Sequence, residues 1–229
     1  MTRLVVFDLD GTLVDSRLDL AASANLLLDE LGAPRLAVAE VERMVGDGAR
    51  MLVQRVLAAA GVETDLDAAL GRFLAIYDEH LLDHTCPYPG VVDALDALGD
   101  RAVLGLLTNK PQHHTARLLE ALGLRDRFFA AIGGDTTFPR KPDPAALLHL
   151  IDTVGARPEA SVMVGDSRVD LETARRAGTR ICLVTYGFGR FTPDELRGVT
   201  VCERSEALGA VVGRLLDELD ATVGHDTRG

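Results

Sequence analysis

The sequence predicts an α/β protein with a doubly wound parallel sheet and a helical cap domain inserted after the first strand. Two observations lead to this prediction. Short apolar runs alternate with helical patterns over most of the 229 residues, which is typical of parallel strands covered by helices on both faces. The alternation stops between Asp15 and about His84, where the pattern is helical throughout.

Each helix or strand is predicted from the spacing of its apolar residues and from the residues at its two ends. Strands are expected at 4–7, 102–107, 128–132, 161–164, 180–184 and 199–202. Helices of the sheet domain are expected at 111–122, 143–154, 167–177 and 205–221. The polar residues after Thr222 are expected to fray.

The helical stretch indicates a separate small domain. Its first helix carries leucines from Leu18 to Leu31 near one face and ends at Gly32 and Pro34. Two further helices are expected, and the turn signal Pro-Tyr-Pro-Gly at 87–90 marks the return to the sheet. The helices are expected at 48–60 and 66–82, the core at 1–15 and 86–222, the cap at 16–85 and a frayed tail at 223–229.

Composition narrows the classes of function. The 24 Lys and Arg residues against 35 Asp and Glu residues give a net charge of −11, which disfavours nucleic acids and anionic membranes as partners. No apolar run is long enough for a membrane span or a signal peptide. The three scattered cysteines suggest reduced thiols and a cytoplasmic protein. A monomer and a homodimer are both expected possibilities.

Two carboxylates follow the first predicted strand directly. Alternation along the chain places Asp8 and Asp10 on the same side, and Gly11 permits a sharp exit. In an open α/β sheet this is the edge where ligands bind. Close carboxylates repel one another, so they favour a bound cation or a shared proton, although they could also cap the next turn.

Polar and charged residues that suit a phosphate group or a metal ion also follow later predicted strands. Thr108 offers a hydroxyl beside a helix N-terminus, which suits an anion such as phosphate. Lys141 is one of only two lysines, with Lys110, among 24 cationic residues, and is predicted to neutralise phosphate. Asp166 and Asp170 follow another strand and favour a Mg²⁺ site shared with Asp8.

The motifs DLDGTLVDS, LLTNKP, RKPDP and GDSRVD occur in the order and spacing of the haloacid-dehalogenase-like superfamily of phosphohydrolases, which this chain therefore resembles. The helical insert resembles the cap that many members carry there. Within the superfamily, the sequences TNKP, RKPDP, Gly133-Gly134-Asp135 and VGDGAR at 45–50 look most like the phosphoglycolate phosphatases.

The resemblance implies a Mg²⁺-dependent phosphomonoesterase that works through an aspartyl-phosphate. Asp8 would attack phosphorus, and Asp10 would protonate the leaving alcohol and then activate water. Metal ligands would come from Asp8, Asp166 and the Asp10 carbonyl, with Asp170 in support. The residues Thr108, Asn109 and Lys141 would bind phosphoryl oxygens.

Substrate choice is expected to lie with the cap, where Arg50 follows a turn that contains Gly46 and Gly48. A guanidinium there could pair with a small carboxylate, as 2-phosphoglycolate requires, or be an ordinary surface arginine. The glycines could let the turn approach the substrate closely. A phosphatase for pyrophosphate, sugar phosphates or nucleotides, a sugar phosphomutase, and a phospho-accepting signalling or binding domain stay as alternatives.

Overall fold

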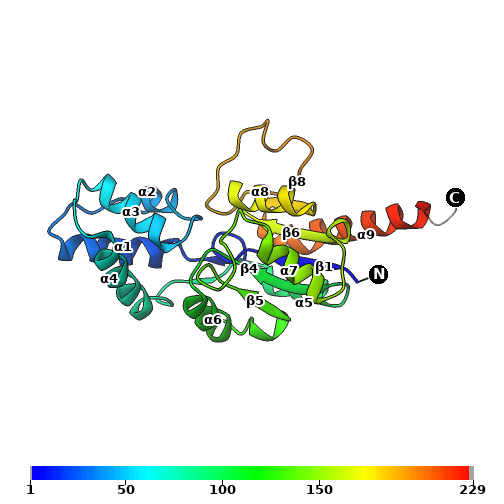
Figure 1. Cartoon of the computed structure of the whole chain (residues 1–229), viewed down its shortest axis with the longest axis horizontal. Coiled ribbons are helices and arrows are strands. Elements are labelled where there is room, and N and C mark those ends of the chain that lie inside the picture. The colour runs from blue at the N-terminus through cyan, green and yellow to red at the C-terminus, as the bar shows by residue number, and fades with distance from the viewer. Residues whose placement is uncertain (1, 227–229) are drawn as a thin grey trace.

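A parallel six-stranded sheet forms the centre of the larger part of the molecule (Figure 1). The structure, a computed structural model, describes residues 2–226, with side chains as far as Leu219. The strand order is β5-β4-β1-β6-β7-β8, and each neighbouring pair is parallel. The strands are β1 (Leu4–Phe7), β4 (Val103–Leu107), β5 (Ala130–Ile132), β6 (Ser161–Gly165), β7 (Arg180–Val184) and β8 (Thr200–Cys202).

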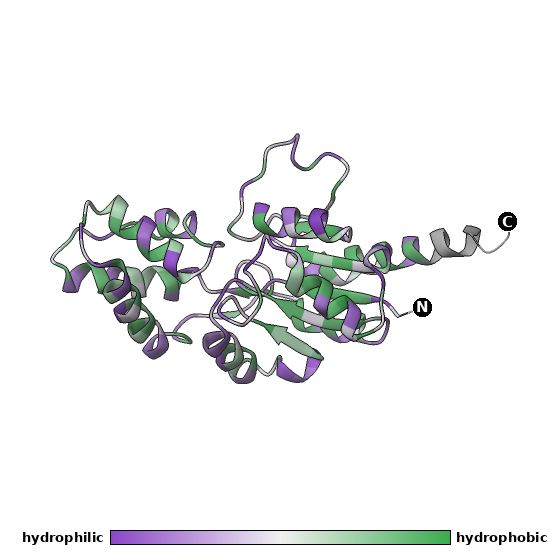
Figure 2. Cartoon of the chain, in the orientation of Figure 1, coloured by the Kyte–Doolittle hydropathy of each residue, from purple (hydrophilic) through white to green (hydrophobic). Residues whose placement is uncertain are grey.

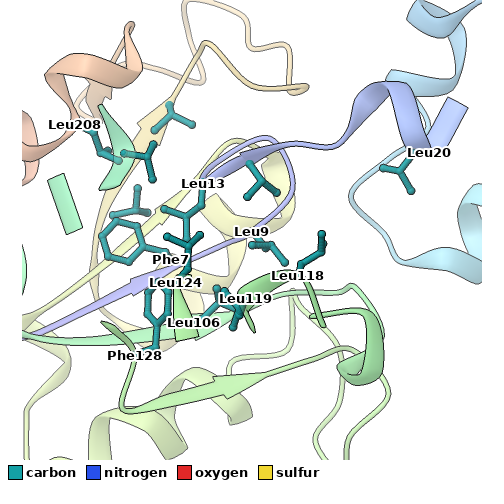
Figure 3. Packing of buried hydrophobic residues seen from close by; sticks show 14 of the residues in the cluster. Phe7, Leu9, Leu13, Leu20, Leu106, Leu118, Leu119, Leu124, Phe128 and Leu208 are labelled. Carbon is teal, nitrogen blue, oxygen red and sulfur yellow. The ribbon is translucent and has the colours of Figure 1, made fainter. Parts of the chain in front are cut away.

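Helices cover both faces of the sheet because both faces are apolar. In β1, Leu4 and Val6 belong to one buried cluster, whereas Val5 and Phe7 belong to the other. The first cluster includes residues of α7 (Ala145–Thr153) and α8 (Arg168–Ala177), and the second includes residues of α5 (Val91–Gly99), α6 (Gln112–Ala121) and α9 (Leu208–Asp226). Figure 3 shows Phe7 packed among leucines and Phe128, with the two rings 6.3 Å apart in an edge-to-face arrangement.

Four helices form a group to one side of the sheet, here called the helical insert (Figure 1). They are α1 (Arg17–Glu30), α2 (Val38–Glu42), α3 (Ala49–Ala59) and α4 (Leu66–Glu79). The chain enters the insert through β2 (Val14–Asp15) and leaves it through β3 (Cys86–Pro87), and these short strands pair antiparallel. The two crossings expected from the sequence therefore lie side by side.

The fold class predicted from the sequence is confirmed, and every predicted strand is present with ends shifted by at most two residues. Two helices, α2 and α5, and the small β2–β3 pair were not predicted. The helix α9 extends to Asp226, into the tail that the sequence predicts to fray, and the fraying itself stays a prediction. The rest of that tail, 227–229, lies outside the described residues.

Hydropathy follows this layering (Figure 2). The strands of the sheet are strongly apolar, whereas the helices alternate between apolar and polar positions, as expected for elements with one solvated side. Within residues 2–226, no helix combines the length and the apolar character that crossing a membrane requires.

Candidate active site

The predicted functional residues converge where three central strands end. The strands β4, β1 and β6 are neighbours in the sheet, so their carboxyl ends meet at one edge. Asp8 and Asp10 follow β1, Thr108 follows β4 and Asp166 follows β6. Parallel strand order alone thus brings together residues that are more than 150 positions apart in the sequence.

Three buried carboxylates form the centre of this edge. One oxygen from each of Asp8, Asp166 and Asp170 lies within 4.8 Å of the others. Burial raises the pKa of Asp8 to about 6, partly opposed by Lys141 and reinforced by Asp170. Burial and the charge of Asp8 also raise the pKa of Asp166 well above its usual value. A cluster of this kind has a strong electrostatic preference for a bound cation.

Lys141 supplies one positive charge to the cluster. Its Nζ lies 2.9 Å from Asp8 Oδ1 and 2.6 Å from Asp170 Oδ1, and its side chain is only 2% exposed. Burial disfavours the ammonium form, but the two carboxylates outweigh it and raise the pKa of Lys141. The lysine for which the sequence predicts a phosphate-neutralising role therefore contacts two carboxylates of the cluster in this structure.

Asp170 is held by the first turn of α8. Its second carboxylate oxygen accepts hydrogen bonds from the backbone N–H and the hydroxyl of Ser167, at 3.0 and 2.6 Å, in a capping box that begins α8. Gly165 leaves room for it, because a Cβ there would lie 2.2 Å from Asp170 Cγ. Asp170 is thus fixed by the helix start and holds Lys141.

Asp166 is oriented by a loop that sequence reasoning did not assign to the site. The backbone N–H groups of Phe188 and Gly189 donate to Asp166 Oδ2 at 2.7 and 3.2 Å. These bonds stabilise the carboxylate through one oxygen and leave the other for a ligand. The glycines at 187 and 189 were a sequence signal for a close backbone approach.

Asp10 lies beside the acidic cluster and has two partners of its own. Ser16 Oγ donates to Asp10 Oδ1 at 2.5 Å, and Lys110 Nζ lies 3.0 and 3.1 Å from its two oxygens. The side chain of Asp10 is 12% exposed, so it can reach the adjacent cavity. Ser16 stands at the start of α1, which ties the position of Asp10 to the helical insert.

Lys110 is the main residue of the site that the motif analysis left without a role. It is buried, and its Nζ donates to the hydroxyl of Tyr77 at 2.6 Å as well as to Asp10. Burial opposes its charge, but Asp10 and Tyr77 raise its pKa overall. The rarity of lysine in this chain and the place of Lys110 in the TNKP motif were the sequence signals for it.

Thr108 and Asn109 differ in what they offer to a ligand. Thr108 is buried in the cavity wall, and its hydroxyl accepts from the N–H of Lys110 at 3.3 Å. The Asn109 amide instead donates to the carbonyl oxygens of Gly46 and Lys141, at 3.0 Å each. The Asn109 side chain therefore joins the insert to the core in this conformation, and its amide hydrogens are not directed at a phosphate.

The three residues proposed for the cap have two different locations. Gly46 and Gly48 line the cavity, and a Cβ on Gly48, where φ is +90°, would lie 3.1 Å from the Asn109 carbonyl oxygen. Arg50 is not brought to the site: its side chain is 44% exposed and forms an ion pair with Asp67 inside the insert. Arg50 points away because α3 begins at Ala49 and turns this position toward the start of α4.

A small cavity lies between the core and the insert. It is small, with room for only a few water molecules. The core contributes polar residues to its wall, and the insert contributes mainly apolar side chains. These are Asp8, Asp10, Thr108, Asn109 and Lys110 from the core, and Leu20, Val45, Leu52, Phe73, Leu74 and Tyr77 from the insert.

His114 in α6 gives a prediction about stability. It packs against Tyr77 with ring centres 5.3 Å apart, and burial and the charge of Lys110 lower its pKa from 6.5, whereas Asp78 opposes this and His113 reinforces it. The folded state therefore binds fewer protons than the unfolded state, so this contribution to stability is complete above pH 6.5 and is lost as the pH falls below it.

We expect His114→Phe, which cannot be protonated, to lose less stability than wild type between pH 7.5 and pH 5.5. Urea unfolding at both pH values measures this difference. Equal losses in the two proteins would show that His114 is not the group responsible.

A comparison with protein families assigns the chain to a class. Residues 5–184 match the family model described as haloacid dehalogenase-like hydrolase. The match covers the strand ends that carry Asp8, Thr108, Lys141 and Asp166. The chain is a haloacid dehalogenase-like hydrolase.

Several individual relatives of this chain are named phosphoglycolate phosphatases. The chain is 41% identical to a phosphoglycolate phosphatase of Rhodospirillum rubrum, over 93% of this chain and 92% of that protein. It is 44% identical to phosphoglycolate phosphatase 1 of Pseudomonas aeruginosa, over 88% and 80% respectively. A crystal structure of a predicted phosphoglycolate phosphatase from Haemophilus somnus superimposes with a TM-score of 0.86 at 30% identity, covering 92% of this chain and 98% of that one.

Proposed function

We propose that this hydrolase converts 2-phosphoglycolate to glycolate and phosphate in a Mg²⁺-dependent reaction. The observation that carries the proposal is that Asp8 lines the cavity together with Asp10, while a carboxylate oxygen of Asp166 lies within 4.8 Å of one of Asp8 and Lys141 Nζ lies 2.9 Å from Asp8 Oδ1. This arrangement provides a nucleophile, a cation site, a charge for the phosphoryl group and a separate acid. The relatives that are named phosphoglycolate phosphatases support the choice of substrate.

The residues present fit a Mg²⁺ ion. Asp8 and Asp166 offer carboxylate oxygens close together, and Lys141 alone supplies less positive charge than three buried carboxylates require. Mg²⁺ prefers oxygen ligands and needs only one or two carboxylates. Asp8, Asp166 and the backbone carbonyl of Asp10 would hold it, whereas Asp170 acts through Lys141. The bound ion would reduce the repulsion between Asp8 and the phosphate dianion.

The side chains of this chain carry the covalent steps in our proposal. A carboxylate oxygen of Asp8 attacks phosphorus, and the bond from phosphorus to the ester oxygen breaks as Asp10 donates a proton to that oxygen. Asp10 then accepts a proton from the water that attacks the aspartyl-phosphate, which releases phosphate and restores Asp8. Lys141, which contacts Asp8, and the hydroxyl of Thr108, which lines the cavity, bind phosphoryl oxygens.

The size of the cavity favours a small ester. A small cavity accommodates a two-carbon acid beside the phosphoryl group more readily than a hexose or a nucleoside, and a second, larger cavity adjoins it at Asp10, Val45 and Gly46. This favours phosphoglycolate over sugar phosphates and nucleotides, including the substrates of a phosphomutase. The three cysteines are unpaired, which supports the proposal of a cytoplasmic enzyme.

Steady-state assays across phosphoglycolate, pyrophosphate, glucose 6-phosphate and AMP test the substrate. We expect phosphoglycolate to have the highest kcat/KM by at least about tenfold. Glucose 6-phosphate and AMP are larger than phosphoglycolate, and pyrophosphate lacks its carboxylate group. A chelator should abolish phosphate release, and added Mg²⁺ should restore it. A leading sugar phosphate would contradict the proposal, and chelator-resistant turnover would contradict the metal requirement.

A further inference from the structure

We infer that Lys110 binds the carboxylate of the substrate, so that the cation that recognises the acid comes from the sheet domain and not from the helical insert. This inference rests on the proposed function and adds a specificity-determining residue to it. It replaces the role that the sequence suggested for Arg50, which lies outside the cavity and is paired with Asp67.

The charges in the cavity wall support this assignment. The insert lines the cavity with aliphatic and aromatic side chains, and Tyr77 contributes the hydroxyl group among them. Within the described lining residues, Lys110 is the one cationic side chain. A carboxylate that enters this cavity must be paired with a positive charge, because burying it alone costs several kcal/mol.

The position of Lys110 matches the length of a two-carbon acid. The general acid must come within about 3 Å of the ester oxygen that it protonates. In phosphoglycolate the carboxylate carbon lies about 2.5 Å beyond that oxygen, as ordinary bond lengths dictate. The carboxylate is therefore placed next to Asp10, and Lys110 Nζ already lies 3.0 Å from an oxygen of Asp10.

Lys110 can turn one donor to the substrate by giving up one of its two contacts with Asp10. An ammonium group has three N–H donors, and the described acceptors of Nζ are the two oxygens of Asp10, at 3.0 and 3.1 Å, and the hydroxyl of Tyr77 at 2.6 Å. The Tyr77 oxygen accepts from Lys110, so its own hydrogen is free to donate to the same carboxylate. Burial holds both groups in a medium of low dielectric, where such bonds are stronger than in water.

Tyr77 also connects recognition to the position of the insert. It lies in α4 and stacks on Phe73, with ring centres 5.8 Å apart. Its hydroxyl meets Lys110 only where the insert contacts the core as described here. The acid-binding pair is therefore complete only with the insert in this position, which makes Lys110 and Tyr77 one recognition unit from two parts of the chain.

Two non-hydrolysable phosphonates test the inference by binding. 3-Phosphonopropionate carries the carboxylate of the substrate, and propylphosphonate replaces it with a methyl group. Calorimetric titration in the presence of Mg²⁺ should show wild type binding the first about 10- to 100-fold more tightly, as expected for a buried charged hydrogen bond. In Lys110→Met this ratio should fall to about threefold or less. Tyr77→Phe should give an intermediate ratio.

Arg50→Ala is the matched comparison for the rival cation, and it should keep the wild-type ratio. Melting temperatures check that each variant is folded, and Lys110→Gln provides a second replacement should the methionine variant unfold. A wild-type ratio near one would refute the substrate proposed above. A large wild-type ratio that persists in both Lys110 variants, or that disappears in Arg50→Ala, would overturn the assignment to Lys110 alone.

Discussion

Asp8→Asn is expected to remove turnover and leave the fold intact. An amide is a poor nucleophile and cannot form the aspartyl-phosphate, so kcat should fall by about 10⁴-fold or more. The fold should persist because the change removes one of three mutually repelling buried carboxylates. Phosphate release from phosphoglycolate measures the first effect, and thermal unfolding measures the second.

The exposed residue Asp93 on α5 offers the matched control for this change. Asp93→Asn removes the same charge from the surface, and its turnover should equal that of wild type. Turnover of Asp8→Asn within about tenfold of wild type would contradict the role of Asp8 as the nucleophile.

Of the substitutions proposed for this chain, Lys141→Met is expected to lower the free energy of unfolding most. Removing the ammonium leaves Asp8 and Asp170 buried without their common partner, which costs about 3–5 kcal/mol. For a chain of this length, that corresponds to a fall in Tm of about 10 °C. The same variant should also lose turnover, because the lysine lies beside the proposed nucleophile.

Arg35→Met tests whether that cost comes from burial. Arg35 also pairs with a carboxylate, that of Asp29, but the arginine side chain is 65% exposed. Exposed ion pairs contribute little because water screens them, so this variant should melt close to wild type. Similar melting temperatures for Lys141→Met and Arg35→Met would show that the buried pair is not the source of stability claimed here.

The sheet could be predicted from the sequence because its strands are apolar on both faces and their ends carry the recognisable polar motifs. The helix α5 was missed although Val91, Leu95 and Leu98 have helical spacing. The helix α2 has only five residues, which is too short for a periodic pattern to develop. The β2–β3 pairing joins segments about 70 residues apart, so no local signal could reveal it.

The acidic residues of the candidate site could be predicted because Asp8, Asp10 and Asp166 come just after strands of one parallel sheet, and Asp170 lies one helical turn beyond Asp166. The direction in which a side chain points from a helix could not be predicted in the same way. Arg50 was a reasonable candidate from its neighbouring glycines, but the rotation of α3 pairs it with Asp67. The link from Lys110 to Tyr77 depends on how the insert packs on the core, and neither residue's neighbours in the sequence indicate it.

The antiparallel pairing of β2 with β3 has a consequence for how such proteins diversify. Because Val14 and Pro87 are partners in that ladder, the segment between them departs from and returns to nearly one point on the scaffold. The segment can then be exchanged for another without altering the connectivity of the catalytic sheet. Such an exchange would keep Lys110 and replace Tyr77, so it would change one half of the recognition unit and leave the other half in place.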